Sequence, residues 1–314
     1  MTASDAEVIG IIGGTGLGPM LLGEVHGERI EVDTPFGRPS APIVRACWAG
    51  VEIAFLPRHG EGHTFSPTAV PYRANLYALK ALGVTRIIAS GATGSLREEI
   101  RPRDLVVVDQ LIDRTTRRPT SFFDEPGLAV HVEFTEPFCP ALRRTLLSSA
   151  DAIGVTVHDG GAYVCMEGPA FSTVAESRMH RSWGGDLIGM TCMPEAQLAR
   201  EAEMCYALIA LPTDYDCWRP HDPSLDKQAL LAEIIANVDA ATANCVALVK
   251  AALRDLAGGA RQDTAPHPTA CGCREALKLA IWTNRANISR ETAARYGVLL
   301  SRYTPGYSPC AATP

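Results

Sequence analysis

Short apolar runs that end in loops of small or polar residues recur along this chain, and they limit the folds open to it. The clearest are Val8 to Ile12, Val51 to Leu56, Arg86 to Ala89 and Tyr206 to Leu211. Each has the length and apolar content of a buried strand. Stretches with helical periodicity lie between them, so we expect an α/β fold, in which ligands bind at the carboxyl ends of the strands.

The first run ends in a glycine-rich loop, Gly13 to Gly18. Glycines let the backbone approach a ligand and turn N–H groups toward an anion, and Thr15 adds a hydroxyl donor. A dinucleotide-binding fingerprint is the competing interpretation. Its third glycine would be at the wrong spacing, however, and Pro19 to Glu24 is too short for the crossover helix. We therefore favour an anion-binding loop.

Two further loops have a composition suited to anions. The second run leads into Pro57 to His63, where Arg58 offers a planar fork of donors beside His59. A solvated polar loop is the alternative, and a metal site at the histidines would need ligands that are not nearby in sequence. The third run leads into Ser90 to Ser95, a loop of small residues. Three such loops after strands favour one shared binding edge.

Asp214 and Asp216 follow the fourth run, one residue apart. If the backbone stays extended there, both carboxylates face the same side. Like charges held close together, and burial, raise the pKa of at least one of them, which would provide a proton donor near neutrality. A turn with two solvated aspartates is the other interpretation of these residues.

Composition excludes several classes of function. The chain has 314 residues, a net charge of -6 and 20% charged residues, which argues against a general nucleic-acid binder while leaving room for a local phosphate pocket. No apolar run has the length of a membrane span, and residues 1–7 lack the basic and apolar regions of a secretory signal. We expect a cytoplasmic protein with no membrane partner.

Helical periodicity predicts the remaining elements. We expect helices over Pro67 to Leu82, Ala141 to Ala152, Val174 to Trp183, Pro194 to Met204 and, as one long helix packed on the sheet, Leu225 to Ala252. Shorter helices are expected over Arg274 to Trp282 and Glu291 to Tyr303. The polar stretch Asp109 to Asp124 is expected to be a loop without chemistry. Gly258 to Pro268 is rich in Gly and Pro, which predicts a domain over 1–257, a linker over 258–270 and a C-terminal helical extension over 271–314.

The chain has 10 cysteines, most of them inside apolar runs. Without a secretory signal they are expected to be small buried hydrophobes rather than a disulfide framework. Cys271 and Cys273 differ, because a Cys-x-Cys pair is close enough for a strained disulfide or for shared metal ligation. No second Cys or His pair at zinc-site spacing accompanies it, so we predict a structural role and no metal site.

Seven longer motifs occur in order between Val8 and Ala252. They are Gly-Gly-Thr-Gly from Gly13, Arg-His-Gly from Arg58, Gly-Ser-Leu-Arg-Glu-Glu from Gly94, Asp-Arg-Thr-Thr from Asp113, Glu-Pro-Phe-Cys-Pro from Glu136, Glu-Gly-Pro-x-Phe-Ser from Glu167 and Thr-Asp-Tyr-Asp-Cys-Trp from Thr213. Together they resemble the trimeric purine nucleoside phosphorylases, most closely the 5'-methylthioadenosine phosphorylase branch. The resemblance implies one α/β domain with a central mixed, twisted β-sheet flanked by helices, followed by a helical tail.

The resemblance also implies an activity: phosphate attacks the anomeric carbon of 5'-methylthioadenosine and releases adenine and 5-methylthioribose 1-phosphate. No cofactor is implied, since inorganic phosphate is a co-substrate. The residues implied to hold phosphate are Thr15, Arg58, His59, Gly91, Ala92 and Thr191. The implied partners are the small-molecule nucleoside and copies of the same chain, as a trimer or a dimer of trimers.

The same resemblance places residues around the nucleoside. Met190 would lie under the ribose, and Phe171 and Ser172 would contact the base. Asp214 would act at N7, with Asp216 beside the exocyclic amine, and His131 would line the 5' end from a neighbouring subunit. Carboxylate acceptors suit the amino group of adenine.

Two segments depart from the pattern. Gly91 stands where the animal branch has Thr, and Pro220 to Leu230, which should cover the 5' group, does not align. Purine nucleoside phosphorylase activity of broader specificity, on adenosine, 5'-deoxyadenosine or inosine, is therefore the alternative.

Overall fold

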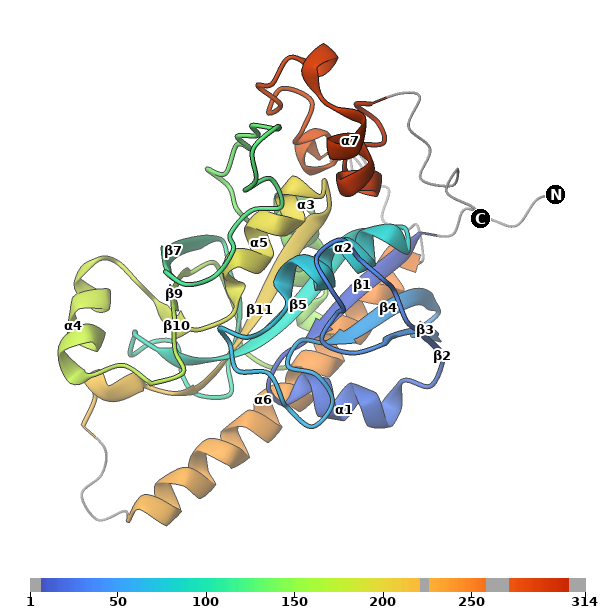
Figure 1. The fold of residues 1–314 in the computed structure, drawn as a ribbon. Helices are drawn as coiled ribbons and strands as arrows, with labels where there is room; N and C mark the ends of the chain where they lie inside the picture. Colours follow the sequence, from blue (N-terminus) through green and yellow to red (C-terminus); the bar gives the residue numbers. More distant parts are fainter. Residues whose placement is uncertain (1–6, 221–225, 258–270, 305–314) are drawn as a thin grey trace.

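The computed structural model of the chain describes residues 7–220, 226–257 and 271–304 (Figure 1). One mixed β-sheet of eleven strands lies at its centre. The strands are β1 (Val8–Gly13), β2 (Glu28–Ile30), β3 (Ile43–Trp48), β4 (Val51–Pro57), β5 (Val84–Ser95), β6 (Leu105–Val107), β7 (Gln110–Arg114), β8 (Val157–Asp159), β9 (Ala162–Met166), β10 (Leu187–Gly189) and β11 (Cys205–Asp214).

The sheet branches at β5. The main path runs β2-β3-β4-β1-β5-β10-β9-β7, while β11 pairs with both β5 and β6, and β6 pairs with β8. The strands β1, β4, β5 and β11, which contain the four runs predicted from the sequence, are parallel neighbours. Their carboxyl ends therefore meet at one edge of the sheet, as expected.

Seven α-helices and several short 3-10 turns surround the sheet in the described residues. The helices are α1 (Leu17–Glu24), α2 (Tyr72–Ala81), α3 (Pro140–Ser148), α4 (Val174–Ser182), α5 (Cys192–Glu201), α6 (Lys227–Ala257) and α7 (Arg290–Tyr296). The 3-10 turns are η1 (Ala150–Ala152), η2 (Asp216–Trp218), η4 (Gly272–Glu275), η5 (Arg285–Asn287) and η6 (Gly297–Leu299).

Each face of the sheet has its own apolar core. On one face, side chains of α1, α3 and α6 cluster with Ile11 of β1. On the other face, side chains of α2, α5 and residues 277–303 cluster with Ile12. Adjacent residues of a strand point to opposite faces, so β1 is buried on both sides. The predicted α/β class, with helices flanking a central mixed sheet, is confirmed.

Several predicted elements differ from the structure. The expected loop Ser90 to Ser95 continues β5, because β11 and β10 pair with it and supply the hydrogen bonds that a loop would leave to water. The expected polar loop after Asp109 begins with β7, which pairs with β9. Pairing with distant strands overrides the weak local β-propensity of both segments.

The C-terminal segment is less helical than predicted. Residues 274–280 form the end of η4 and turns, not a helix, and Ile281 forms an isolated β-bridge with Val130. Their backbone serves other partners: Trp282 N–H donates to Ala129 O over 3.0 Å, and His131 N–H donates to Ala280 O over 2.9 Å. The predicted linker 258–270 lies outside the described residues, so the division of the chain there stays a prediction.

The buried residues of the long helix α6 begin at Asn237 and continue to Leu253. Figure 1 shows its N-terminal half extending away from the body. Leu231 and Ile235 are accordingly 58% and 52% exposed, whereas Cys245 and Leu248 are buried. Among the helices in the described ranges, only α6 is long and apolar enough to span a membrane. A core helix of a globular protein has the same length and composition.

Candidate functional site

The first three loops meet at the carboxyl edge of the sheet. Gly13 of β1 is in register with Pro57 of β4, and the N–H of Arg58 donates to Gly13 O over 2.9 Å. The N–H of Gly14 donates to the hydroxyl of Ser90 in β5 over 3.4 Å. An added Cβ on Gly14 would lie 2.6 Å from Arg58 Nη1, so only glycine permits this approach.

Arg58 is completely buried, and its planar fork is bound to a carboxylate of the protein itself. Nε and Nη2 donate to the two oxygens of Glu195 over 2.8 and 2.7 Å, and Nη1 donates to Ser90 O over 2.7 Å. Burial lowers the pKa of Arg58, but the charge and hydrogen bonds of Glu195 outweigh it and raise the pKa above its ordinary value. The guanidinium donors that were expected to face an anion are thus bound to Glu195 and Ser90. A ligand could use only the second N–H of Nη1 or of Nη2.

His59 is neutral in this environment. Burial and the neighbouring charge of Arg58 lower its pKa to about 4. Its Nδ1 lies 2.8 Å from Phe65 O, and because a carbonyl only accepts, Nδ1 must donate there. The other ring nitrogen, Nε2, is then an acceptor, which suits a protonated phosphate oxygen or a hydroxyl rather than a bare anion. His63 stacks on His59 with ring centroids 4.3 Å apart.

Thr191 and Gly91 face each other beside these loops. Thr191 lies just after β10, at the start of α5, and is 7% exposed. An added Cβ on Gly91 would be 3.5 Å from the Thr191 hydroxyl. Ala92 follows Gly91 in β5 and is half-buried, while Thr15 is exposed. The absence of a side chain at Gly91 thus leaves space beside the Thr191 hydroxyl at this edge.

Asp214 and Asp216 are brought together by a turn and not by strand alternation. β11 ends at Asp214, and Asp216 has a φ of 48°, so the extended backbone considered in the sequence interpretation does not continue. Asp214 Oδ2 accepts the N–H of Asp216 over 2.9 Å, and its Oδ1 accepts the hydroxyl of Thr213 over 2.8 Å. The turn places both carboxylates at the end of β11, beside Gly94 of β5.

One oxygen of this pair is buried without a hydrogen-bond partner among the described residues: Oδ2 of Asp216. The Cβ of Asp216 lies 3.1 Å from the position that a Cβ added to Gly94 would occupy. Buried polar atoms in folded proteins are nearly always paired, so an unpaired carboxylate oxygen indicates a place for an external donor. A positive φ at a non-glycine residue at the same position is typical of functional sites.

The structure assigns an important position to Arg118, a residue of the stretch that the sequence predicts to be a loop without chemistry. Its side chain is buried, and Nη1 donates to the carbonyls of Met190 and Met193 over 2.6 and 2.7 Å. Its Nη2 donates to Glu167 O over 2.7 Å. Nothing in the sequence distinguishes it from Arg114 or Arg117, because its partners are distant in the chain.

Glu167 completes this arrangement. Burial raises the pKa of its carboxyl, but hydrogen bonds from the Thr116 N–H, the Thr68 hydroxyl and Arg118 outweigh it and hold the pKa at about 2. The next residue, Gly168, packs against the thioether of Met190, where an added Cβ would lie 2.5 Å from Sδ. Arg118 and Glu167 therefore fix the position of Met190 relative to the loop 167–172.

A sequence profile of the phosphorylase superfamily matches residues 8–254. This chain belongs to the phosphorylase superfamily. The family resemblance inferred from the seven motifs is confirmed.

Curated relatives are similar over nearly the whole chain. An S-methyl-5'-thioadenosine phosphorylase of Geobacter sulfurreducens is 46% identical over 297 residues, which cover 95% of this chain and 99% of the relative. One from Pyrococcus furiosus is 44% identical and covers 86% of this chain and 97% of the relative.

Solved structures are similar as well. A methylthioadenosine phosphorylase from an antarctic soil metagenomic library has a TM-score of 0.82 at 40% identity, covering 95% of this chain and all of that one. A mutant adenosine/methylthioadenosine phosphorylase from Schistosoma mansoni in complex with methylthioadenosine has a TM-score of 0.77 at 34% identity, covering 89% and 100%.

This member of the superfamily brings most of the predicted site residues to one edge of the sheet, and His131 lies apart from them. Phe171 is 85% exposed, so the alternative in which it fills the core is wrong. The carbonyl of its neighbour Ser172 accepts from the Cys217 thiol over 3.2 Å, which places the loop 167–172 beside the aspartate turn. His131 is exposed and packs edge-on against Trp282 with ring centroids 5.6 Å apart. Within one chain, its packing partner is the C-terminal segment.

Proposed function

We propose that this chain is a pentosyltransferase that catalyses phosphorolysis of 5'-methylthioadenosine to adenine and 5-methylthioribose 1-phosphate. The observation that carries this proposal is the arrangement along β5: Gly91 lies against Thr191 at one end, and Gly94 lies against Asp216 at the other. An anion-binding end and a carboxylate end thus share one strand. The relatives that bear the name of this activity support the choice of reaction.

The reaction needs two charges to be stabilised. When the glycosidic bond breaks, positive charge develops on the sugar and negative charge on the purine, so an anion must lie beneath the ribose and an acid at the leaving base. We assign the phosphate to the backbone and hydroxyls of Thr15, Gly91, Ala92 and Thr191. Arg58 would contribute its second N–H groups, and neutral His59 would accept a hydrogen bond from a phosphate hydroxyl. Met190, held by Arg118, would lie under the ribose.

The base end is assigned to the aspartate turn. Asp214 would carry the proton to N7 of the leaving purine, and the unpaired Oδ2 of Asp216 would accept from the C6 amino group. A 6-oxopurine would place a carbonyl oxygen against this acceptor and leave both unsatisfied. Adenine nucleosides are therefore the favoured substrates, with Phe171 and Ser172 beside the base.

We further propose a cytoplasmic enzyme without a cofactor that assembles as a trimer or a dimer of trimers. His131 would line the 5' group of a nucleoside in a neighbouring subunit; its exposure supports this. Sedimentation of the native protein tests the assembly, and a monomer would contradict it.

A substrate panel at fixed phosphate tests the activity. Purified protein is incubated with 5'-methylthioadenosine, 5'-deoxyadenosine, adenosine and inosine, with and without phosphate, and the free base is measured chromatographically. We expect phosphate-dependent release of adenine, fastest from 5'-methylthioadenosine, and little hypoxanthine. Equal turnover of inosine would favour the broader purine nucleoside phosphorylase. Release without phosphate would indicate a hydrolase, and tight purine binding without product would indicate a binding protein.

A further inference from the structure

Four cysteines from three distant parts of the chain converge on the face of the sheet that α1, α3 and α6 cover. They are Cys139, Cys205, Cys271 and Cys273, and their Sγ atoms all lie within 4.8 Å of one another. In the described ranges, no other group of three or more His, Cys, Asp or Glu side chains has a spacing that could hold a metal ion. The second ligand pair missing from the sequence pattern is thus supplied by the fold.

Local structure explains the convergence. Cys139 precedes α3, and its N–H donates to Tyr206 O over 2.8 Å, which places it beside Cys205 at the start of β11. Cys271 is extended and Gly272 begins the turn η4, so the backbone reverses between Cys271 and Cys273. Cys139, Cys205 and Cys273 are buried, and Cys271 is half-buried.

The spacing is that of ligands around a common centre. A tetrahedral zinc ion with Zn–S bonds of about 2.3 Å holds its sulfurs roughly 3.8 Å apart. The Sγ atoms of Cys205 and Cys271 are 3.0 Å apart, well beyond a disulfide bond of about 2.05 Å. Every described cysteine is free. A shift of less than about an ångström per thiol would complete a tetrahedron.

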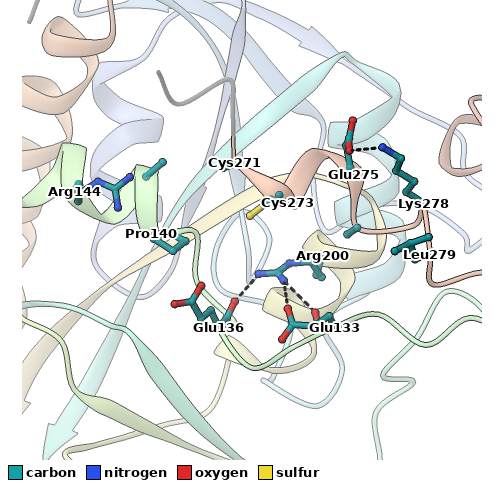
Figure 2. Close-up of a pocket in the computed structure, with 13 residues that line it drawn as sticks. Glu133, Glu136, Pro140, Arg144, Arg200, Cys271, Cys273, Glu275, Lys278 and Leu279 are labelled. Atoms are coloured by element: carbon teal, nitrogen blue, oxygen red, sulfur yellow. Dashed lines mark hydrogen bonds and ion pairs between the residues drawn. The ribbon is translucent and has the colours of Figure 1, made fainter. Parts of the chain in front are cut away.

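One feature of the backbone beside the cluster favours a thiolate. Cys139 is the N-cap of α3, where backbone N–H groups favour negative charge. Cys271 and Cys273 also line an adjoining cavity of about 650 Å³ (Figure 2). Its charged groups include two ion pairs, Arg200 with Glu133 and Lys278 with Glu275.

We propose that these four cysteines bind one zinc ion in a closed, structural site. Four protein ligands leave no open position for water or substrate, so the site would not be catalytic. Binding replaces thiol protons by the metal and releases them to solvent, without a change of oxidation state. Because Cys271 and Cys273 begin the segment 271–304, and Cys139 and Cys205 belong to the α/β body, the ion would fasten that segment to the sheet. The proposal does not depend on the enzymatic activity.

Metal content of the full chain is the first test. Protein produced with zinc in the medium and purified under reducing, anaerobic conditions should contain about one zinc per chain by mass spectrometry. Cys205→Ser and Cys273→Ser should lose most of it. Cys245→Ser, at a buried cysteine of α6 outside the cluster, and Cys47→Ser, at an exposed one, should retain it.

Cobalt substitution covers the case in which a cysteine variant fails to fold. Wild-type protein refilled with Co²⁺ should show thiolate-to-metal charge transfer and the intense visible bands of a tetrahedral site, and chelation should lower its melting temperature. The proposal is overturned if the reduced wild-type chain contains no zinc and gives no cobalt spectrum. It is equally overturned if peptide mapping of anaerobically purified protein finds disulfides among these four cysteines.

Discussion

Arg58 and Glu195, 137 residues apart, form a bidentate ion pair in which both side chains are completely buried. The pair ties the end of β4 to α5, and Tyr206 of β11 donates to the same carboxylate over 2.7 Å. Three elements of the proposed phosphate end are therefore held by one carboxylate. Removing one member of such a pair leaves an uncompensated buried charge.

We expect Glu195→Gln to lower the free energy of unfolding by about 3 to 5 kcal/mol, since Arg58 would stay buried without its counter-charge. Urea denaturation followed by circular dichroism measures the change. The same exchange at Glu52, which pairs with Arg45 in a partly exposed ion pair, should cost less than about 1 kcal/mol. Equal effects at the two positions would refute a special role for the buried pair.

Gly14→Ala should disrupt the junction of the loops. The new Cβ would lie 2.6 Å from both Arg58 Nη1 and Ser90 O, so the backbone of the loop must move. We expect at least a tenfold increase in the KM for phosphate, measured in steady-state assays, because the displaced groups are those assigned to phosphate. Gly23→Ala in α1 meets no atom within 4 Å and serves as the matched control. An unchanged KM in the Gly14 variant would remove this loop from phosphate binding.

Asp214→Asn tests proton donation to the base. The asparagine has nearly the same shape and can keep one of the two hydrogen bonds to Thr213 and Asp216, but it cannot transfer a proton to N7. We expect kcat to fall by roughly 10² to 10⁴ with 5'-methylthioadenosine while the melting temperature changes little. Asp239→Asn on the exposed side of α6 is the control. Wild-type kcat in the Asp214 variant would exclude it as the acid.

Glu201 gives the stability a predictable pH dependence. Burial raises the pKa of its carboxyl from 4.5 to about 7. Its contribution to stability is thus fully present below about pH 4.5 and is lost as the pH rises through 7, because the folded state binds the extra proton between these values. Glu201→Gln does not titrate.

Relative to the wild type, the Glu201→Gln variant should therefore become more stable by about 2 to 3 kcal/mol between pH 5 and pH 8, at about 1.4 kcal/mol per pKa unit. Urea denaturation at the two pH values measures the difference. Glu233→Gln, an exposed position on α6, gives the generic effect of the exchange. A difference that is the same at both pH values would contradict the raised pKa of Glu201.

The sequence was sufficient to predict the shared edge of the sheet, because each apolar run and the small or polar residues after it form a local pattern. Arg58, Thr191 and the two aspartates were found in this way or through the family motifs. Local patterns could not show that Ser90 to Ser95 is a strand, since its hydrogen bonds come from β10 and β11. They also could not show the turn at Asp216, where the φ is 48° and the side chain lies beside Gly94, a residue distant in the chain.

Pairings between distant residues account for the remaining differences. Glu195 lies in an ordinary helical pattern, and only the fold reveals that it occupies the fork of Arg58. Arg118 resembles its solvent-facing neighbours in sequence, yet it binds the carbonyls next to Met190. The four clustered cysteines span more than a hundred residues, so no spacing rule for metal ligands applies to them.

The strand β5 sets the distance between the two ends of the proposed site. Gly91 and Gly94 are three residues apart, about 10 Å in an extended strand, and β11 pairs with this stretch of β5 across the interval. This distance cannot stretch or shorten without breaking the sheet. Changes of nucleoside preference in such a scaffold must therefore arise by exchanging side chains at its ends, while insertions or deletions within β5 would abolish the site.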